Sequence, residues 1–361
     1  MRLSKISLGI FLTLILILTF FLFSDSKVRT EEPFRNIEGA EGTGTAIIMT
    51  GAGARIPQQV ALLEELYDRG CLKDVVFISG VSAGALNAVV LNAILSGRMT
   101  WDEYKEILFK LENKDIFSIP EGKRLPLNTE PTRLLLKEVV EERLGYHSIG
   151  DLPFMTEISF SNYPGIRQGK KVYRMCSRKI NSETDTTLNL VDILMATSAV
   201  PFAFPSVKIN NVSTIPDLNF IDGGFSVDYL PFKALLDFQE QRGERVKTVY
   251  IISRKGGMSN SIGDELESLG IDNKIRLDKL TPSVDNLLVK VFFNRLEAFA
   301  KDDPEMIMRS YVWIPDFEQN FLMLNFNNLR EQYTITKAWA VKNDPVSLGD
   351  YLLYNQLKNK R

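Results

Sequence analysis

The sequence has a single histidine, His147, and only two cysteines, Cys71 and Cys176. Two cysteines make neither a disulfide framework nor a thiolate metal site, and one histidine removes the usual ligand sets of zinc and non-haem iron. We therefore expect no metal and no other cofactor. Positive charge is not in excess either, because the formal net charge is -2 and the isoelectric point is near 5.8. Nucleic acids are bound mainly through lysines and arginines that neutralise phosphates, so no nucleic-acid partner is expected.

The composition is that of a globular protein, with 45% hydrophobic and 24% charged residues in a chain of 361. Its N-terminus differs, because the run Leu8–Phe23 has no charge and is apolar on every face of a helix. This run predicts a membrane location through a single N-terminal helix, with export after signal-peptide cleavage near Ser26 as the alternative. The predicted division of the chain is a membrane segment over 1–26, a polar linker over 27–44, a catalytic core over 45–255, and an α/β extension over 256–361 packed on the core.

Short apolar runs and amphipathic helices alternate after residue 44. Thr45–Met49 predicts a buried strand, and a glycine-rich loop and a helix over Pro57–Arg69 follow it. Val75–Ile78 predicts a second strand, again followed by a tight turn and an apolar helix. A repeated order of strand, loop and helix implies parallel strands joined by crossover helices.

Two segments later in the chain bear on the fold and the site. Glu157–Phe160 and Lys171–Met175 predict a hairpin around residues 162–165. Residues 101–145 predict helices that either pack as cover on the core or cap a cleft. Packing is favoured, because apolar helix faces usually belong to a core.

The pentapeptide Gly80-Val81-Ser82-Ala83-Gly84 matches the pattern GxSxG between a predicted strand and a predicted helix. In a nucleophile elbow, flanking glycines permit a strained turn that exposes a serine hydroxyl at a helix N-terminus. The usual triad then needs an acid and a histidine after the serine, but no histidine follows His147. Either Ser82 is not a nucleophile, or His147 reaches it from an unusual position, or an aspartate takes the proton directly.

The loop Gly51-Ala52-Gly53-Ala54-Arg55 lies at the first strand-to-helix junction, next to the elbow if the two strands pair. In a hydrolase, such a loop supplies amide donors for the oxyanion of a tetrahedral intermediate. A dinucleotide-binding loop is disfavoured because Ile56 occupies the last glycine position of GxGxxG. Arg55 is expected to fix the loop rather than to contact the substrate.

Asp222, in Phe220-Ile221-Asp222-Gly223-Gly224, is the candidate base. It ends an apolar strand, and two glycines after it allow another strand end to come close without obstruction by side chains. A free aspartate has a pKa of about 3.9 and is a poor base for a hydroxyl, so partial burial must raise its basicity.

These motifs, together with Ala196–Pro205, which is similar to the stretch ASxAxPxxFP, resemble the patatin-like phospholipase family over about Thr45 to Leu236. The resemblance implies a three-layer α/β/α sandwich with a mostly parallel central sheet, and a Ser/Asp dyad. It makes Ser82 the nucleophile and Asp222 the base. The amides of Gly51, Ala52 and Gly53 become the oxyanion hole, with motif support from Gly80, Gly84, Arg55, Gly223 and Gly224.

The resemblance also implies the activity. We expect a membrane-associated serine acyl hydrolase that cleaves lipid esters in the manner of a phospholipase A or a lysophospholipase, with membrane lipids as substrate and no metal. Two alternatives stand beside it. One is a Ser-His-Asp esterase that uses His147, and the other is a catalytically silent membrane-bound scaffold, suggested because Ala52 and Ile56 replace glycines of the family's GGGxRG loop. No obligate protein partner is indicated.

Overall fold

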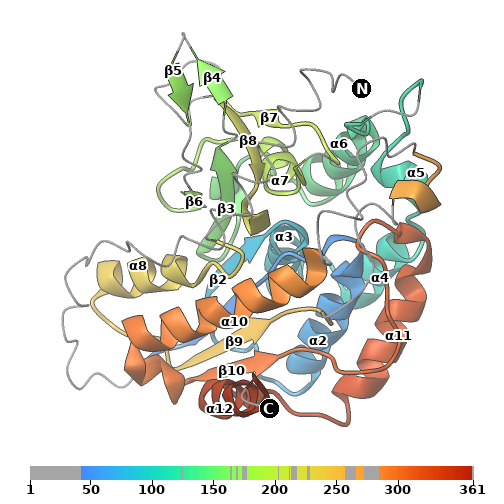
Figure 1. Cartoon of the computed structure of the whole chain (residues 1–361). Coiled ribbons are helices and arrows are strands. Elements are labelled where there is room, and N and C mark those ends of the chain that lie inside the picture. Colours follow the sequence, from blue (N-terminus) through green and yellow to red (C-terminus); the bar gives the residue numbers. More distant parts are fainter. Residues whose placement is uncertain are drawn as a thin grey trace.

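A β-sheet forms the centre of the protein, and helices cover both of its faces (Figure 1). This structure is a computed structural model. The predicted membrane segment and nearly all of the predicted linker lie outside the residues that it describes. The described residues are 42–122, 125–162, 165–167, 170–172, 177–201, 203–210, 212, 218–225, 228–256, 266–271 and 284–359.

The sheet has nine strands within the described residues. Its strands are short and rich in buried apolar residues, as expected of strands covered on both faces. In chain order they are β1 (Thr45–Met49), β2 (Val75–Val81), β3 (Thr156–Asn162), β6 (Ser177–Asn181), β7 (Val207–Lys208), β8 (Asn219–Asp222), β9 (Thr248–Ile252), β10 (Ser310–Trp313) and β11 (Val346–Ser347).

The strand order is β11-β10-β9-β1-β2-β3-β8-β7, and β6 also pairs with β3. Strands β10, β9, β1, β2 and β3 are parallel to one another. Strands β6, β7, β8 and β11 pair in the antiparallel sense. The predicted parallel core is confirmed, and the structure adds antiparallel strands on both sides of it.

Helices form a layer on each face of this sheet, which confirms the α/β/α sandwich. The crossover helices return the chain between parallel strands. Short 3-10 turns lie at Gly53–Arg55, Ile149–Asp151, Gly223–Phe225, Pro304–Ile307 and Phe326–Asn328, and a π-helical turn lies at Lys137–Arg143. The α-helices are α2 (Ile56–Asp68), α3 (Ala83–Leu95), α4 (Trp101–Leu108), α5 (Asn113–Ile116), α6 (Glu130–Leu136), α7 (Leu190–Thr197), α8 (Phe232–Arg242), α10 (Val284–Asp302), α11 (Leu329–Ala340) and α12 (Leu348–Asn359).

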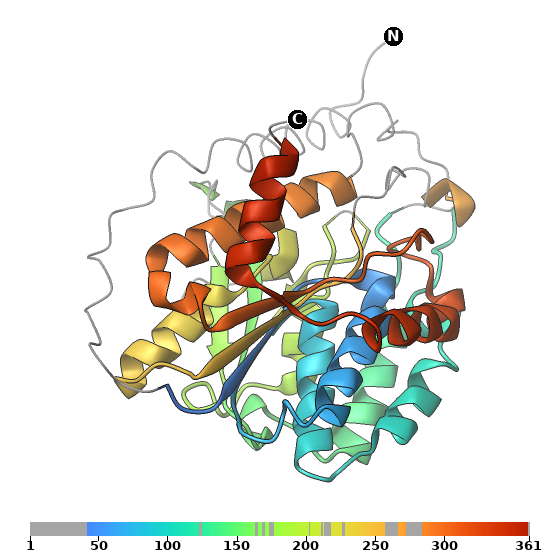
Figure 2. The same cartoon turned by 90° about the horizontal axis from the view of Figure 1, so that it is seen from below.

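The two helical layers enclose two cores, because successive residues of a strand point to opposite faces. Ile47 and Met49 of β1 pack in the core that contains α2, α3 and α7. Ala46 and Ile48 pack in the core that contains α8 and α10. Figure 2 shows α8, α10 and α12 on one side of the sheet and α2, α3 and α11 on the other.

Two predictions need correction. Strand β3 pairs with β6, and a separate small hairpin joins β4 (Gly165–Arg167) to β5 (Lys170–Val172). Of the predicted partner Lys171–Met175, residues 173–175 lie outside the described residues. The prediction that an N-terminal helix places the protein in a membrane is wrong. In the described part of the chain, no helix is both long and apolar enough to cross a bilayer. The predicted helix falls on residues outside that part.

The sheet register brings the three motifs to one edge. Met49 at the end of β1 pairs with Gly80 of β2, so the glycine loop and the elbow leave the sheet side by side. On the other side of β2, Val81 pairs with Ser159 of β3, and Asp222 of β8 pairs with the next residue, Phe160. Antiparallel strand β8 therefore ends at the level of the elbow.

Candidate active site

Ser82 lies in the turn between β2 and α3, in a backbone conformation that side chains rarely adopt. Its φ is 55° and its ψ is -130°, and among the described residues it is the only non-glycine residue with a positive φ. Such a conformation costs of order 1–3 kcal/mol and persists where the surroundings impose it. The strain indicates that the position of the Ser82 hydroxyl matters more than the local backbone energy.

The glycines on either side of Ser82 are required by close backbone contacts. A Cβ atom on Gly80 would lie 2.4 Å from the carbonyl oxygen of Gly84, and a Cβ atom on Gly84 would lie 2.6 Å from the carbonyl oxygen of Thr50. Carbon and oxygen atoms cannot approach so closely. Gly84 therefore lets the first turn of α3 pack directly against the end of β1.

Thr197, the last residue of α7, fixes the elbow from the side. Its Oγ1 accepts a hydrogen bond of 2.8 Å from the amide of Ser82 and donates one of 2.6 Å to the carbonyl oxygen of Ser159. Thr197 is fully buried. The strained turn is thus tied to α7 and to β3 through one hydroxyl group.

Asp222 lies close to Ser82, because both residues line one small pocket and the Ser82 hydroxyl acts to lower the pKa of the Asp222 carboxyl. The Oδ1 atom of Asp222 accepts a hydrogen bond of 2.7 Å from the amide of Gly224. The side chain is buried, with 2% of its residue surface exposed. Burial raises the pKa of Asp222 to about 7, although the Ser82 hydroxyl and the Gly224 amide act in the opposite direction. A carboxylate of this basicity is matched to proton transfer near neutral pH.

Gly223 and Gly224 permit this arrangement of Asp222. A Cβ atom on Gly223 would lie 2.7 Å from the carbonyl oxygen of Ser159, and one on Gly224 would lie 2.9 Å from Oδ1 of Asp222. The first glycine lets the chain pass close to β3, and the second lets its amide reach the carboxylate.

The glycine loop lies beside Ser82. A Cβ atom on Gly51 would lie 3.4 Å from Cβ and 4.0 Å from Oγ of Ser82. The amides of Gly51, Ala52 and Gly53 donate to no acceptor among the described residues. Amides of this kind, next to a nucleophile, are suited to an oxyanion. The methyl group of Ala52 packs in the core with α2 and α3, which explains how this position accommodates a larger residue than glycine.

Arg55 is almost fully buried, and its Nη1 donates a hydrogen bond of 3.0 Å to the carbonyl oxygen of Lys255, beyond β9. The amide of Ala54 donates to the carbonyl oxygen of Met323 at 2.7 Å. At Gly53, whose φ is 55°, a Cβ atom would lie 2.6 Å from that same oxygen. The loop is therefore held from two sides, by the end of β9 and by the chain before α11.

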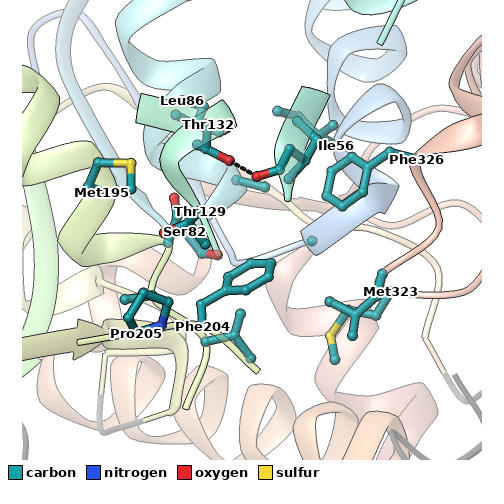
Figure 3. A pocket seen from close by; sticks show the side chains of 17 residues that line it. Ile56, Ser82, Leu86, Thr129, Thr132, Met195, Phe204, Pro205, Met323 and Phe326 are labelled. Carbon is teal, nitrogen blue, oxygen red and sulfur yellow. Dashed lines mark hydrogen bonds between the residues drawn. The ribbon is translucent and has the colours of Figure 1, made fainter. Parts of the chain in front are cut away.

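An apolar pocket opens at Ser82 (Figure 3). It holds about 700 Å³ of empty space, including the space at its open mouth. Its walls come from distant parts of the chain, as the labelled side chains of α2, α3, α7 and the segment before α11 show. The segment 101–145 contributes to it as well as to the core. The lining residues are Gly53, Ile56, Ser82, Ala83, Leu86, Ile116, Thr129, Thr132, Met195, Ser198, Ala199, Val200, Phe204, Pro205, Met323, Leu324 and Phe326.

A smaller pocket lies on the other side of Ser82 and contains Asp222. It is lined by the glycine loop and by Arg254 and Tyr229, among others. Ser82, Gly53, Val200 and Met323 line both pockets, so the nucleophile candidate stands at their junction. In the described residues, no group of three or more histidine, cysteine, aspartate or glutamate side chains is placed to hold a metal ion.

Comparison with protein families matches residues 47–236, which are 190 of the 361 residues, to the model described as "Patatin-like phospholipase". This chain belongs to the patatin-like phospholipase family. The match begins within β1 and ends within α8, so it includes the glycine loop, the elbow, the Ala196–Pro205 stretch and the Asp222 motif. No curated protein matches the chain significantly by sequence.

Several solved structures are similar to this patatin-like chain. VipD from Legionella pneumophila has 12% identity and a TM-score of 0.36, over 88% of this chain and 72% of its own. A structure of full-length SpcU with full-length ExoU from the type III secretion system of Pseudomonas aeruginosa has 15% identity and a TM-score of 0.32, over 79% and 68%. Human GIVD cytosolic phospholipase A2 has 11% identity and a TM-score of 0.35, over 76% of this chain and half of its own.

His147 lies away from Ser82 in this patatin-like protein. Its carbonyl oxygen accepts a hydrogen bond from the amide of Leu190, at the start of α7, whereas Thr197, at the end of α7, contacts Ser82. Seven residues of helix span about 10 Å. His147 is also exposed and lines neither pocket at Ser82.

Sequence reasoning missed two contributors to the site. Thr197 lies in the family stretch, but nothing in that stretch indicates a hydrogen bond to an amide 115 residues earlier. Met323 lies in the predicted C-terminal extension, 87 residues beyond the end of the family match, and packs directly against Gly53. No local signal marks either residue.

Proposed function

We propose that this protein is a serine acyl hydrolase that cleaves lipid esters in the manner of a phospholipase A or a lysophospholipase. Membership of the patatin-like phospholipase family supports lipid hydrolysis in general. The observation that carries the finer proposal is the position of the strained Ser82 beside the buried Asp222 carboxylate, in one pocket with the glycine loop.

In the first step, Oγ of Ser82 attacks the carbonyl carbon of the ester while its proton moves to Asp222. The carbonyl oxygen becomes an oxyanion, which the amides of Gly51, Ala52 and Gly53 stabilise. When the tetrahedral intermediate collapses, the carbon–oxygen bond to the leaving alcohol breaks. Asp222 returns the proton to that alcohol, and an acyl-enzyme ester on Ser82 remains.

In the second step, a water molecule attacks the acyl-enzyme. Asp222 takes a proton from this water, the oxyanion forms again in the same place, and the ester to Ser82 breaks. The proton passes back to Oγ of Ser82, and the fatty acid leaves. One carboxylate thus serves as base and as acid in both steps, which a pKa near 7 permits.

The two pockets suggest how the substrate lies. The larger pocket is built mainly from apolar side chains such as Leu86, Met195 and Phe204, and an acyl chain is the part of a lipid that such walls accommodate. The smaller pocket is lined by Asp222 and by Arg55 and Arg254, among others, and suits the polar leaving group.

The test is fatty-acid release by the full chain from a phospholipid, a lysophospholipid and a triglyceride, with wild type compared with Ser82→Ala and Asp222→Asn. We expect each substitution to reduce turnover by at least about 1,000-fold, because nucleophile and base act as one unit. His147→Ala is the control and should stay within about twofold of wild type.

The outcomes separate the candidates. Loss of activity in His147→Ala comparable to that in Ser82→Ala would restore the Ser-His-Asp esterase. A folded wild type that neither reacts with a fluorophosphonate probe nor releases fatty acid would favour the silent scaffold. Retained turnover in Asp222→Asn would remove Asp222 as the base.

A further inference from the structure

A row of buried polar side chains lies behind the glycine loop and connects three helices to it. Nε2 of Gln59 in α2 donates to the carbonyl oxygen of Thr50 at 2.8 Å. Nδ2 of Asn87 in α3 donates to Oε1 of Gln59 at 3.0 Å, and the hydroxyl of Tyr104 in α4 donates to Oδ1 of Asn87 at 2.8 Å. All three side chains are buried, with 0%, 1% and 7% exposure respectively. Buried polar groups of this kind are retained only where they are well paired.

The direction of every hydrogen bond in this row follows from one atom. The carbonyl oxygen of Thr50 can only accept, so Gln59 must present its amino group to it and its oxygen to Asn87. Asn87 must then present its own amino group to Gln59 and its oxygen to Tyr104. Tyr104 must therefore donate, and burial raises the pKa of its phenol above the usual value, so the proton stays in place. All donors point toward the glycine loop.

The row ends on the peptide that separates Thr50 from Gly51. In a planar trans peptide, the carbonyl group and the following N–H group point in opposite directions. Because Gln59 holds the Thr50 carbonyl from the α2 side, the Gly51 amide is directed away from α2. A Cβ atom on Gly51 would lie 3.4 Å from Cβ of Ser82, so this amide borders the reacting hydroxyl.

We propose that Gln59, Asn87 and Tyr104 are positioning residues that lock the Thr50–Gly51 peptide in the orientation which turns the Gly51 amide toward the developing oxyanion. This inference rests on the proposed function, in which that amide is an oxyanion donor. None of the three side chains touches the substrate. Their head-to-tail order also polarises the peptide in the sense that strengthens the Gly51 N–H as a donor.

The expected effects decline along the row. Gln59→Met keeps the length of the side chain but removes the donor to Thr50, and kcat should fall by about 100-fold, the lower value for a lost oxyanion donor. Asn87→Ala leaves Gln59 in place without its partner and should lower kcat by about tenfold. Tyr104→Phe removes only the last donor. Because polarisation strengthens each hydrogen bond of a chain by roughly 10–30%, kcat should fall by only about twofold to threefold.

Two matched controls separate positioning from general loss of structure. Asn92 is a buried asparagine on the same helix as Asn87, but it pairs with Ala88, Phe154 and Thr156 instead of the glycine loop. Asn92→Ala should lower the thermal midpoint at least as much as Asn87→Ala does and leave kcat within about twofold. Tyr146 is fully buried, and its hydroxyl has no partner in the described structure, so Tyr146→Phe controls for Tyr104→Phe.

The decisive readout is inhibition by a long-chain trifluoromethyl ketone, which adds Ser82 to form a hemiketal oxyanion. The inhibition constant should rise in Gln59→Met and Asn87→Ala by the factor by which kcat/KM falls, while KM stays constant. Wild-type affinity and kcat in folded Gln59→Met would overturn the inference, as would equal losses in Asn87→Ala and Asn92→Ala. If wild type itself neither hydrolyses esters nor binds the ketone, the proposed function fails instead, so the two failures are distinguishable.

Discussion

Replacing Asp222 by asparagine is expected to abolish hydrolysis and at the same time to stabilise the fold above neutral pH. Burial raises the pKa of the Asp222 carboxyl from 3.8 to about 7, so the ionised carboxylate is destabilised in the folded protein. Asparagine has the same shape, carries no charge and can still accept the hydrogen bond from the Gly224 amide. The site therefore maintains a base at the expense of stability, a recurrent feature of active sites.

The sign follows from proton linkage. Below pH 3.8 the carboxyl group is neutral in both states and contributes no difference. Between pH 3.8 and 7 the unfolded chain loses this proton while the folded chain keeps it, so wild type loses stability as the pH rises. Over the whole window a rise in pKa from 3.8 to about 7 corresponds to about 4 kcal/mol.

Urea denaturation of wild type and Asp222→Asn at pH 5, 6, 7 and 8 measures this effect. The stability of the variant relative to wild type should increase by about 3 kcal/mol from pH 5 to pH 8. Ser82→Ala is the control, because it is equally inactive but keeps the carboxylate, and it should show no such increase. A difference between Asp222→Asn and wild type that is constant with pH would refute the reasoning.

Three further predictions concern the elbow, the second buried acid and the apolar pocket. Gly84→Ala puts a Cβ atom 2.6 Å from the Thr50 carbonyl oxygen and should abolish esterase activity and lower the thermal midpoint. Gly349→Ala in α12 is the control, because its Cβ atom would meet nothing closer than a side-chain methyl group at 3.4 Å, and it should leave both nearly unchanged. Burial raises the pKa of Glu157 to about 7. The free energy of unfolding of Glu157→Gln, measured with urea, should therefore rise relative to that of wild type by up to about 3 kcal/mol between pH 5 and 8. A difference that does not change with pH would contradict this. Leu86→Trp fills part of the larger pocket and should lower kcat/KM for long-chain esters about tenfold more than for acetate esters; equal losses would place the acyl chain elsewhere.

The motifs were predictable because each encodes a local requirement. At positions 80 and 84, where α3 starts close to the end of β1, a side chain would clash, so glycine is required. Both glycines can be read directly from the sequence. The apolar runs of β1 and β2 predicted buried parallel strands, since such strands are covered on both faces. The partner of β3 was placed too early in the chain, because β3 pairs with β6 at Ser177–Asn181, and a strand's partner is decided by packing across the sheet.

The sequence by itself determined the strained serine turn, the glycine loop and an aspartate at a strand end, because each depends on residues that are adjacent in the chain. Only the tertiary structure decided that Asp222 meets Ser82, through the register of β8 on β3 and β3 on β2. It also decided that Gln59, Asn87 and Tyr104 are buried in one row, although each reads as an ordinary polar residue on a helix. The physical reason is that contacts between residues tens or hundreds of positions apart are set by sheet register and helix packing, which involve the whole core at once and leave no signal in any short segment.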